Sequence, residues 1–165
     1  MSTNFPSRPH LQHLRAQAKT LLAALRAGST EAEATIREHH PGLGKRPLDP
    51  AAFKLADAQL VVARRSGFES WPKLARFVEQ LRALEGVWGF DSLEVGGNAV
   101  PTGAIAGSHI RIDGDRFRVE SPEAVYEGEL VIDVESDPHE IDIEFIAGPE
   151  AGHWSYGIYR LDGDT

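Results

Sequence analysis

The spacing of apolar residues changes near residue 85 of this chain. Before that point apolar residues recur every three or four positions, and after Trp88 they alternate with polar residues. A period near 3.6 is typical of amphipathic helices, and a period of 2 is typical of half-buried strands. The pattern therefore predicts an α+β protein, with a bundle of about four short helices in residues 1–83 and an antiparallel β domain in residues 84–165.

The first two helices are predicted from their apolar stripes and their end signals. Pro9 suits a first helical turn and Gly28 suits a C-terminal left-handed residue, which gives a helix over about residues 9–27. Thr30 followed by Glu33 has the spacing of a capping box, which predicts the start of a short second helix.

The third and fourth helices are predicted in the same way. Asp49 as the N-cap and Pro50 at the first position predict a third helix that ends at Gly67. Ser70 is the predicted cap of the fourth helix, and Trp71 is its predicted core anchor.

The same region allows a second interpretation. Gln59, Ala63 and Gly67 have the spacing of a helix-turn-helix, which would make the following helix a DNA-recognition helix. Trp71 and Pro72 occupy positions that such a helix would use for bases, and this argues against nucleic acid as a partner. A packing module is the favoured interpretation, and a DNA-binding regulator is kept as an alternative.

After Trp88, apolar and polar residues alternate within several consecutive segments. This pattern predicts consecutive antiparallel strands with one apolar face, rolled into a barrel or part of one. Centring a hairpin on residues 121–124 predicts its register. The expected cross-strand pairs are Arg118 with Glu127, Arg116 with Glu129, Val119 with Tyr126, and Phe117 with Gly128. A further hairpin centred on residue 137 allows Asp133 to lie opposite Asp142, which would raise the pKa of one carboxyl or bind a cation, but solvated acids are the favoured interpretation.

Charge differs between the halves as sharply as periodicity does. Residues 1–85 hold 13 Lys and Arg against 8 Asp and Glu, whereas residues 86–165 hold 4 against 17. The chain has no Cys, which excludes disulfides and thiolate metal sites and fits a reducing cytoplasm. No apolar run reaches the roughly 18 residues of a membrane span. We therefore expect a cytoplasmic protein with no membrane partner.

Two resemblances refine the fold. Leu55-Ala-Asp-Ala-Gln-Leu-Val-Val-Ala-Arg-Arg-Ser-Gly-Phe-Glu-Ser-Trp-Pro-Lys-Leu74 resembles the small helical segment that precedes ankyrin repeats in bacterial proteins, and that segment implies no activity. Leu84-Glu-Gly-Val-Trp-Gly-Phe90, Ile112-Asp-Gly-Asp-Arg-Phe117 and Gly157-Ile-Tyr-Arg-Leu-Asp-Gly-Asp164 resemble a lipocalin-like domain family abundant in Planctomycetes and related bacteria.

The second resemblance implies a small calycin-type barrel without accepted catalytic residues. Family members continue for one or two more strands after the motif that ends this chain, so we expect a barrel that is incomplete at its C-terminus. An incomplete barrel has an open edge, and truncation, self-association or a covering protein partner are the alternatives for that edge.

The interior of the expected barrel is the predicted binding site. Aromatic side chains on its inner face would line an apolar cup, with Tyr hydroxyls to orient a small apolar or amphipathic ligand. The predicted ligand-binding residues are Trp88, Phe90, Phe117, Tyr126, Phe145, Trp154 and Tyr156. The alternative is a filled barrel that serves as a protein-interaction or scaffold module, since a small barrel can be filled by its own side chains.

Catalytic and metal chemistry find no support in the spacing of polar residues. No His-x-His or His-Glu-x-x-His pattern gathers the seven His, and no Gly-x-Ser-x-Gly elbow is present. We therefore predict no catalytic residues, no metal site and no cofactor, and favour a binding protein over an enzyme.

Overall fold

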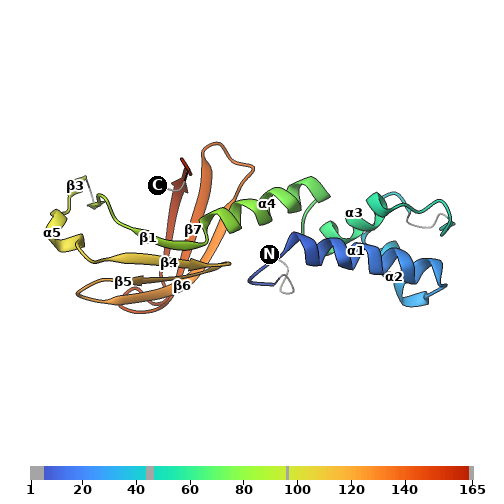
Figure 1. The fold of residues 1–165 in the computed structure, drawn as a ribbon, viewed down its shortest axis with the longest axis horizontal. Helices are drawn as coiled ribbons and strands as arrows, with labels where there is room; N and C mark the ends of the chain where they lie inside the picture. Colours follow the sequence, from blue (N-terminus) through green and yellow to red (C-terminus); the bar gives the residue numbers. More distant parts are fainter. Residues whose placement is uncertain (1–5, 44–46, 96, 164–165) are drawn as a thin grey trace. The chain divides into compact units, whose positions relative to one another are not determined.

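The computed structural model describes residues 6–43, 47–95 and 97–163. It separates into two compact units, Met1–Val78 and Glu79–Thr165, so that the boundary falls within the fourth helix. The first unit is helical, and the second carries an antiparallel sheet (Figure 1). The predicted α+β class is confirmed.

Helices account for nearly all of the regular structure of the first unit. Their apolar faces recur at the predicted helical spacing and bury one common core. The helices are α1 (Leu11–Arg26), α2 (Thr30–His39), α3 (Leu55–Arg65) and α4 (Trp71–Leu84), the last of which continues into the second unit. The largest fully buried side chains of the core are Ile36, Val61, Leu74 and Val78. Trp71 is half-buried and packs against this core.

The cap of α2 differs from the predicted capping box. Ser29 is the N-cap, and its hydroxyl oxygen accepts the N–H of Ala32 at 3.3 Å. Glu33 lies one turn before Arg37 and accepts its guanidinium at 2.7 Å. Gly28 ends α1 with φ of 81°, and this turn leaves Ser29, not Thr30, in the extended conformation that an N-cap requires.

The start predicted for α3 is also wrong, because Asp49 caps a separate turn. Its carboxylate accepts the N–H of Ala51 at 2.9 Å, and the helix begins only at Leu55. There the carboxylate of Asp57 accepts the N–H of Lys54 at 2.8 Å, which satisfies one of the free donors of the first turn. At α4 the predicted cap is confirmed, since the hydroxyl of Ser70 accepts the N–H of Lys73.

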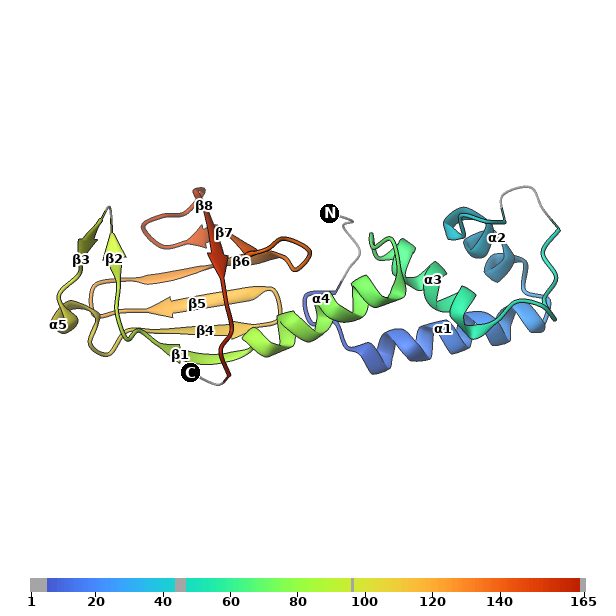
Figure 2. The same ribbon diagram turned by 90° about the horizontal axis from the view of Figure 1, so that it is seen from above.

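The second unit is built on a six-stranded antiparallel sheet in the order β1-β4-β5-β6-β7-β8. Its strands are β1 (Gly86–Gly89), β4 (His109–Asp113), β5 (Arg116–Glu120), β6 (Val125–Asp133), β7 (His139–Ala147) and β8 (Trp154–Tyr159). Between β1 and β4 lie the short pair β2 (Glu94–Val95) and β3 (Asn98–Ala99) and the short helix α5 (Thr102–Ile105). Strand direction turns steeply between β1, β4 and β5 and the later strands (Figures 1 and 2).

The sheet does not close into the expected barrel among the described residues. β1 and β8 are its two ends, and each pairs with a neighbour on one side only. The inner face nevertheless carries the core of this unit. Its buried side chains are Ile112, Phe117, Leu130, Ile132 and Val134.

The register predicted for the hairpin of β5 and β6 is confirmed. Arg118 lies opposite Glu127, Phe117 opposite Gly128, and the other two predicted pairs also match. The hydroxyl of Ser121 closes the turn, because it donates to the carbonyl of Ala124 and accepts the N–H of the same residue.

The register predicted for the next hairpin is wrong. Glu140, not Asp142, lies opposite Asp133. The carboxylate of Asp133 accepts the N–H of Glu135 at 2.8 Å and the hydroxyl of Ser136 at 3.1 Å, and these bonds fix the turn. They also lower the pKa of Asp133, with the Glu135 N–H as the largest cause, which is opposite to the rise that a facing carboxylate would produce.

Gly128 lies at a position of β6 where a side chain would collide with the neighbouring strand. A Cβ at this residue would lie 1.9 Å from the carbonyl oxygen of Glu144 and 2.6 Å from the ring of Phe117. The pairing of β6 with β7 shifts between Glu127 and Gly128, as at a β-bulge. The missing side chain therefore makes room for the neighbouring strand and for an aromatic ring.

Substitution of Gly128 by Ala should destabilise the second unit by about 3 kcal/mol, because the strand backbone of β7 must move to admit the methyl group. The free energy of unfolding from urea titration measures this loss. Gly157→Ala is the matched control, since its Cβ would meet Ile141 at 3.5 Å, an ordinary contact. We expect the control to stay within about 0.5 kcal/mol of the wild type, and equal losses in the two variants would contradict this account.

Candidate functional site

The seven aromatic residues predicted to form one site lie in three places. Directly paired residues of antiparallel strands project to the same face, so the strand register decides which side each ring occupies. Phe117, Tyr126 and Phe145 share the inner face in the middle of the sheet. Trp88 and Phe90 belong to the segment around β1.

The middle of the inner face is filled by an aromatic cluster. The rings of Phe117 and Phe145 meet edge to face, with centroids 5.6 Å apart and an interplanar angle of 88°. Tyr126 contacts Phe145 in a similar arrangement at 6.1 Å. Such pairs are favourable because the positive edge of one ring meets the negative face of the other. Phe117 is buried, so this part of the interior is core and not a cavity.

Trp88 has a structural role at the start of the sheet. Its indole N–H donates to the carbonyl of Leu84 at 2.8 Å, which satisfies one of the free carbonyls at the end of α4. Trp88 is half-buried and lies opposite Ile110 of β4. The hydrogen bond therefore couples the end of the helix to the first strand.

Trp154 and Tyr156 lie on the opposite face from the aromatic cluster, so the expectation that they line the interior is wrong. Trp154 is paired with Glu144 and Tyr156 with Asp142. Glu144 is in turn paired with Glu129, which contacts Arg116 on the outer face. The inward positions of β8 are held by Ser155, Gly157 and Tyr159.

A pocket of about 240 Å³ opens at the end of the sheet, next to the aromatic cluster. Phe90 follows β1, and Tyr126 belongs to β6, so the fold brings two predicted residues together there. The hairpin of β5 and β6 supplies one wall and α5 supplies another. The apolar lining is completed by Leu93, Val100, Ala104, Ile105 and Val119.

Polar groups of the pocket come from the hairpin and from the residue before β4. Ser108, Ser121 and Glu123 line the pocket together with Tyr126. The hydroxyl of Ser121 is already committed to the turn of its own hairpin. The carboxylate of Glu123 and the side chains of Ser108 and Tyr126 are therefore the groups that can orient a ligand.

Sequence reasoning missed the wall formed by the segment between β1 and β4. Residues 91–108 show neither a helical nor a strand period, so no face could be assigned to them. In the structure α5 carries Ala104 and the buried Ile105 against the pocket. Nothing in the sequence pattern signals this placement.

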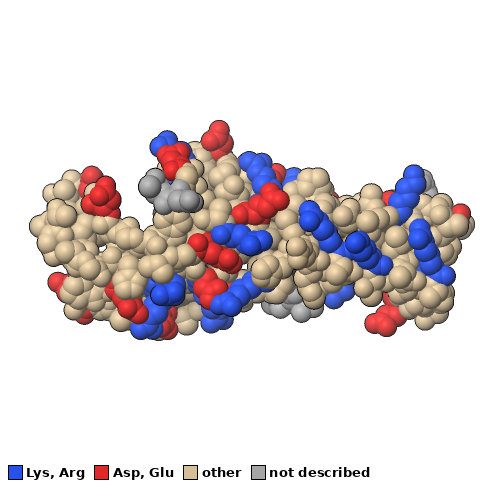
Figure 3. All heavy atoms as spheres, in the orientation of Figure 1, with Lys and Arg blue, Asp and Glu red and all other residues tan. Residues whose placement is uncertain are grey.

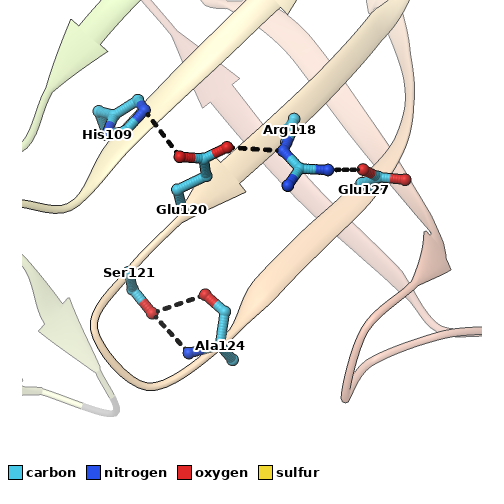
Figure 4. Close-up of polar contacts among 6 residues, drawn as sticks. All are labelled: His109, Arg118, Glu120, Ser121, Ala124 and Glu127. Carbon is cyan, nitrogen blue, oxygen red and sulfur yellow. Dashed lines mark hydrogen bonds and ion pairs between the residues drawn. The ribbon is translucent and has the colours of Figure 1, made fainter.

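The outer face of β4, β5 and β6 carries a chain of charged contacts (Figure 4). Arg118 donates from Nε to Glu120 at 2.7 Å and forms a second ion pair with Glu127. Nε2 of His109 lies 3.5 Å from the other carboxylate oxygen of Glu120. The hydrogen bond from Arg118 lowers the pKa of Glu120, and the carboxylates of Glu120 and Glu127 raise the pKa of Arg118.

This charged chain does not assemble a hydrolytic triad. His109 contacts Glu120, but the nearby Ser121 directs its hydroxyl to Ala124 (Figure 4). A nucleophilic serine needs a hydrogen bond to its general base. Among the described residues no group of three or more His, Asp and Glu could hold a metal ion.

The predicted helix-turn-helix spacing is explained locally by packing. Ala63 is fully buried in the helical core, and Gly67 follows α3 with φ of 89°. Lys73, at the start of α4, pairs with Glu69 at 2.9 Å. On the face drawn in Figure 3, Lys and Arg predominate over α1–α3. DNA binding by this unit stays an untested alternative, and a packing module stays the favoured prediction.

Comparisons with protein-family models, with curated proteins and with solved structures find no match to the chain. The resemblances to a lipocalin-like family and to a segment ahead of ankyrin repeats thus stay predictions. In the part of the chain that the structure describes, no helix has the length and apolar character needed to cross a bilayer.

Replacing Arg118 by Gln should raise the pKa of Glu120 towards its ordinary value, because the hydrogen bond that favours the ionised carboxylate is lost. Since the folded-state pKa is the depressed one, the stabilisation by this contact is present at neutral pH and disappears as the pH falls through that pKa. NMR titration of the Glu120 carboxyl carbon measures the shift.

Arg116→Gln serves as the control, because Arg116 contacts Glu129 and not Glu120. This variant should leave the Glu120 titration unchanged. A Glu120 midpoint that is the same in the Arg118 variant and the wild type would show that the contact does not persist in solution.

Proposed function

We propose that the second unit binds a small apolar or amphipathic molecule in the pocket between Phe90 and Tyr126, without chemistry of its own. The observation that carries this proposal is the pocket itself, where an apolar lining surrounds a few polar groups. Such a composition is typical of small-molecule sites, in which apolar walls supply affinity and polar groups fix orientation.

The volume of the pocket restricts the ligand. At about 240 Å³ it lies below the roughly 300 to 1,000 Å³ of common ligand sites. A molecule of one or two rings fits the enclosed part, and a longer molecule must extend into solvent. The carboxylate of Glu123 at the rim favours a ligand with a hydrogen-bond donor or a positive group at its outer end.

The resemblance to lipocalin-like domains supports the same function. Calycin-type barrels hold ligands at the mouth of a curved sheet, and here the pocket lies at one end of the inner face. We infer that the sheet is an open, lipocalin-like one in which the middle of the inner face is filled by Phe117 and Phe145 and the end by α5 is hollow. A small barrel has little interior space beyond that taken by its own side chains.

The neutral fluorescent amine N-phenyl-1-naphthylamine tests this proposal on the full chain. Its emission should rise on binding, and Ala104→Phe should weaken binding by about tenfold or more because the new ring fills the pocket. Ala104 is exposed on α5, so the substitution leaves the core intact.

Ala106→Phe is the matched control, since Ala106 is exposed next to α5 but does not line the pocket. It should bind the amine as the wild type does. Absence of binding by the wild type, or equal affinity in the Ala104 variant, would overturn the proposal.

A further inference from the structure

The edge strand β8 lacks the usual protection against pairing with another chain. It ends the sheet, with β7 as its only neighbour among the described residues. From Trp154 to Tyr159 it contains no charged residue and no Pro. Edge strands normally carry one of these, or a bulge, to prevent the addition of a further strand.

The outer face of β8 presents an exposed row of large apolar side chains. Trp154, Tyr156 and Ile158 are 43%, 77% and 67% exposed. The rings of Trp154 and Tyr156 lie nearly parallel, with centroids 6.4 Å apart and an interplanar angle of 15°. This exposure is costly in water unless a partner covers the row.

A row of carboxylates runs beside these rings on β7. Glu140 pairs with Ile158, Asp142 with Tyr156 and Glu144 with Trp154. No Lys or Arg occurs between Arg118 and Arg160, whereas the same stretch holds 11 Asp and Glu. The charge is therefore uncompensated by basic residues on these two strands.

We propose that β8 is a docking edge for an extended cationic peptide segment, which adds as a further strand and lays Lys or Arg side chains over the rings of Trp154 and Tyr156. The backbone of the segment would pair with the free edge of β8, as in β-strand addition. Every second side chain of the segment would project to the outer face.

The geometry of a sheet places both recognition elements within reach. Neighbouring strands lie about 4.8 Å apart, so the added strand would lie about 10 Å from the backbone of β7. A Lys or Arg side chain that lies across a ring of β8 brings its charge towards Asp142 or Glu144. The cation then meets the face of an aromatic ring and a carboxylate together, and each interaction favours it.

A second copy of this chain is the less favourable occupant. Paired edge to edge, it would place its own Glu140, Asp142 and Glu144 three strand spacings, about 14 Å, from the first acidic row. At that distance the repulsion is largely screened, but the second copy adds further negative charge and neutralises none. A cationic segment instead neutralises the row. Charge complementarity therefore selects a basic partner.

A short acetylated peptide that alternates Lys with Val, labelled with tetramethylrhodamine, tests the docking edge by fluorescence anisotropy against the full chain. The same peptide with Glu in place of Lys is the ligand control. We expect binding of the Lys peptide only, with an affinity that falls as salt rises. Hydrogen exchange should slow at amides of β8 and not at those of β1, because only β8 gains main-chain partners.

Two pairs of substitutions separate the rings from the charges. Trp154→Ser with Tyr156→Ser should weaken the Lys peptide about tenfold through loss of the cation–π surface. Asp142→Asn with Glu144→Gln should weaken it about tenfold at low salt and less at high salt.

Exposed residues elsewhere in the sheet unit supply the controls. Val87→Ser removes a side chain that is 53% exposed on the other edge strand, and it should change affinity less than about twofold. Asp91→Asn with Glu94→Gln removes two exposed carboxylates outside the six-stranded sheet and should have a similarly small effect.

Three results would overturn the proposal. One is equal binding of the Glu peptide, and another is unchanged binding by the Trp154 and Tyr156 variant. The third is self-association of the chain without peptide, measured by sedimentation equilibrium and abolished by Tyr156→Ser, because the occupant would then be a second copy. The loss of N-phenyl-1-naphthylamine binding in Ala104→Phe reports on the pocket, and the effect of the Trp154 and Tyr156 variant on the Lys peptide reports on β8, so failure of either proposal is distinguishable from failure of the other.

Discussion

The close approach of β6 and β7 at Gly128 is the constraint on which the sheet unit depends. Only a residue without a side chain admits the carbonyl of Glu144 and the ring of Phe117 at this point. The same space lets Phe117 and Phe145 meet edge to face above the strand. Side chains alternate between the two faces along a strand. The inward position of Gly128 therefore decides which residues of β6 and β7 belong to the core and which face outwards.

The two faces of the sheet then follow from that alternation. Inside, the aromatic cluster occupies the middle, and a pocket lies at the end where α5 and Tyr126 line the same space. On the outer face, acidic residues of β6 lie opposite basic residues of β5, as Glu127 lies opposite Arg118. The strands β7 and β8 themselves contain no Lys or Arg, and Trp154 and Tyr156 lie beside carboxylates. Charge is thus balanced on one side of the outer face and unbalanced on the other.

The sequence was informative where structure is decided by neighbours in the chain. The hairpin of β5 and β6 was predicted in full register, because Ser121 closes a short turn and every inward residue is apolar. β8 was placed in the wrong phase, since Trp154, Tyr156 and Ile158 alternate with Ser155 and Gly157 and are the more apolar set. On an edge strand the register with β7 overrides that preference. Likewise, Ala104 could not be assigned to the pocket from the sequence, because the position of α5 depends on tertiary packing with residues far away in the chain.

The pocket and the docking edge use opposite faces, and this separation has a consequence for how they work together. Tyr126 and Phe145 contact each other on the inner face, whereas Trp154 pairs with Glu144, the residue before Phe145, on the outer face. Neither site takes side chains from the other, so both occupants fit at once. The two faces share the backbones of β6 and β7, where a side chain at Gly128 would collide with the carbonyl of Glu144. Tight packing of this kind between two strands resists small movements of the backbone, and it favours independent occupation of the two faces.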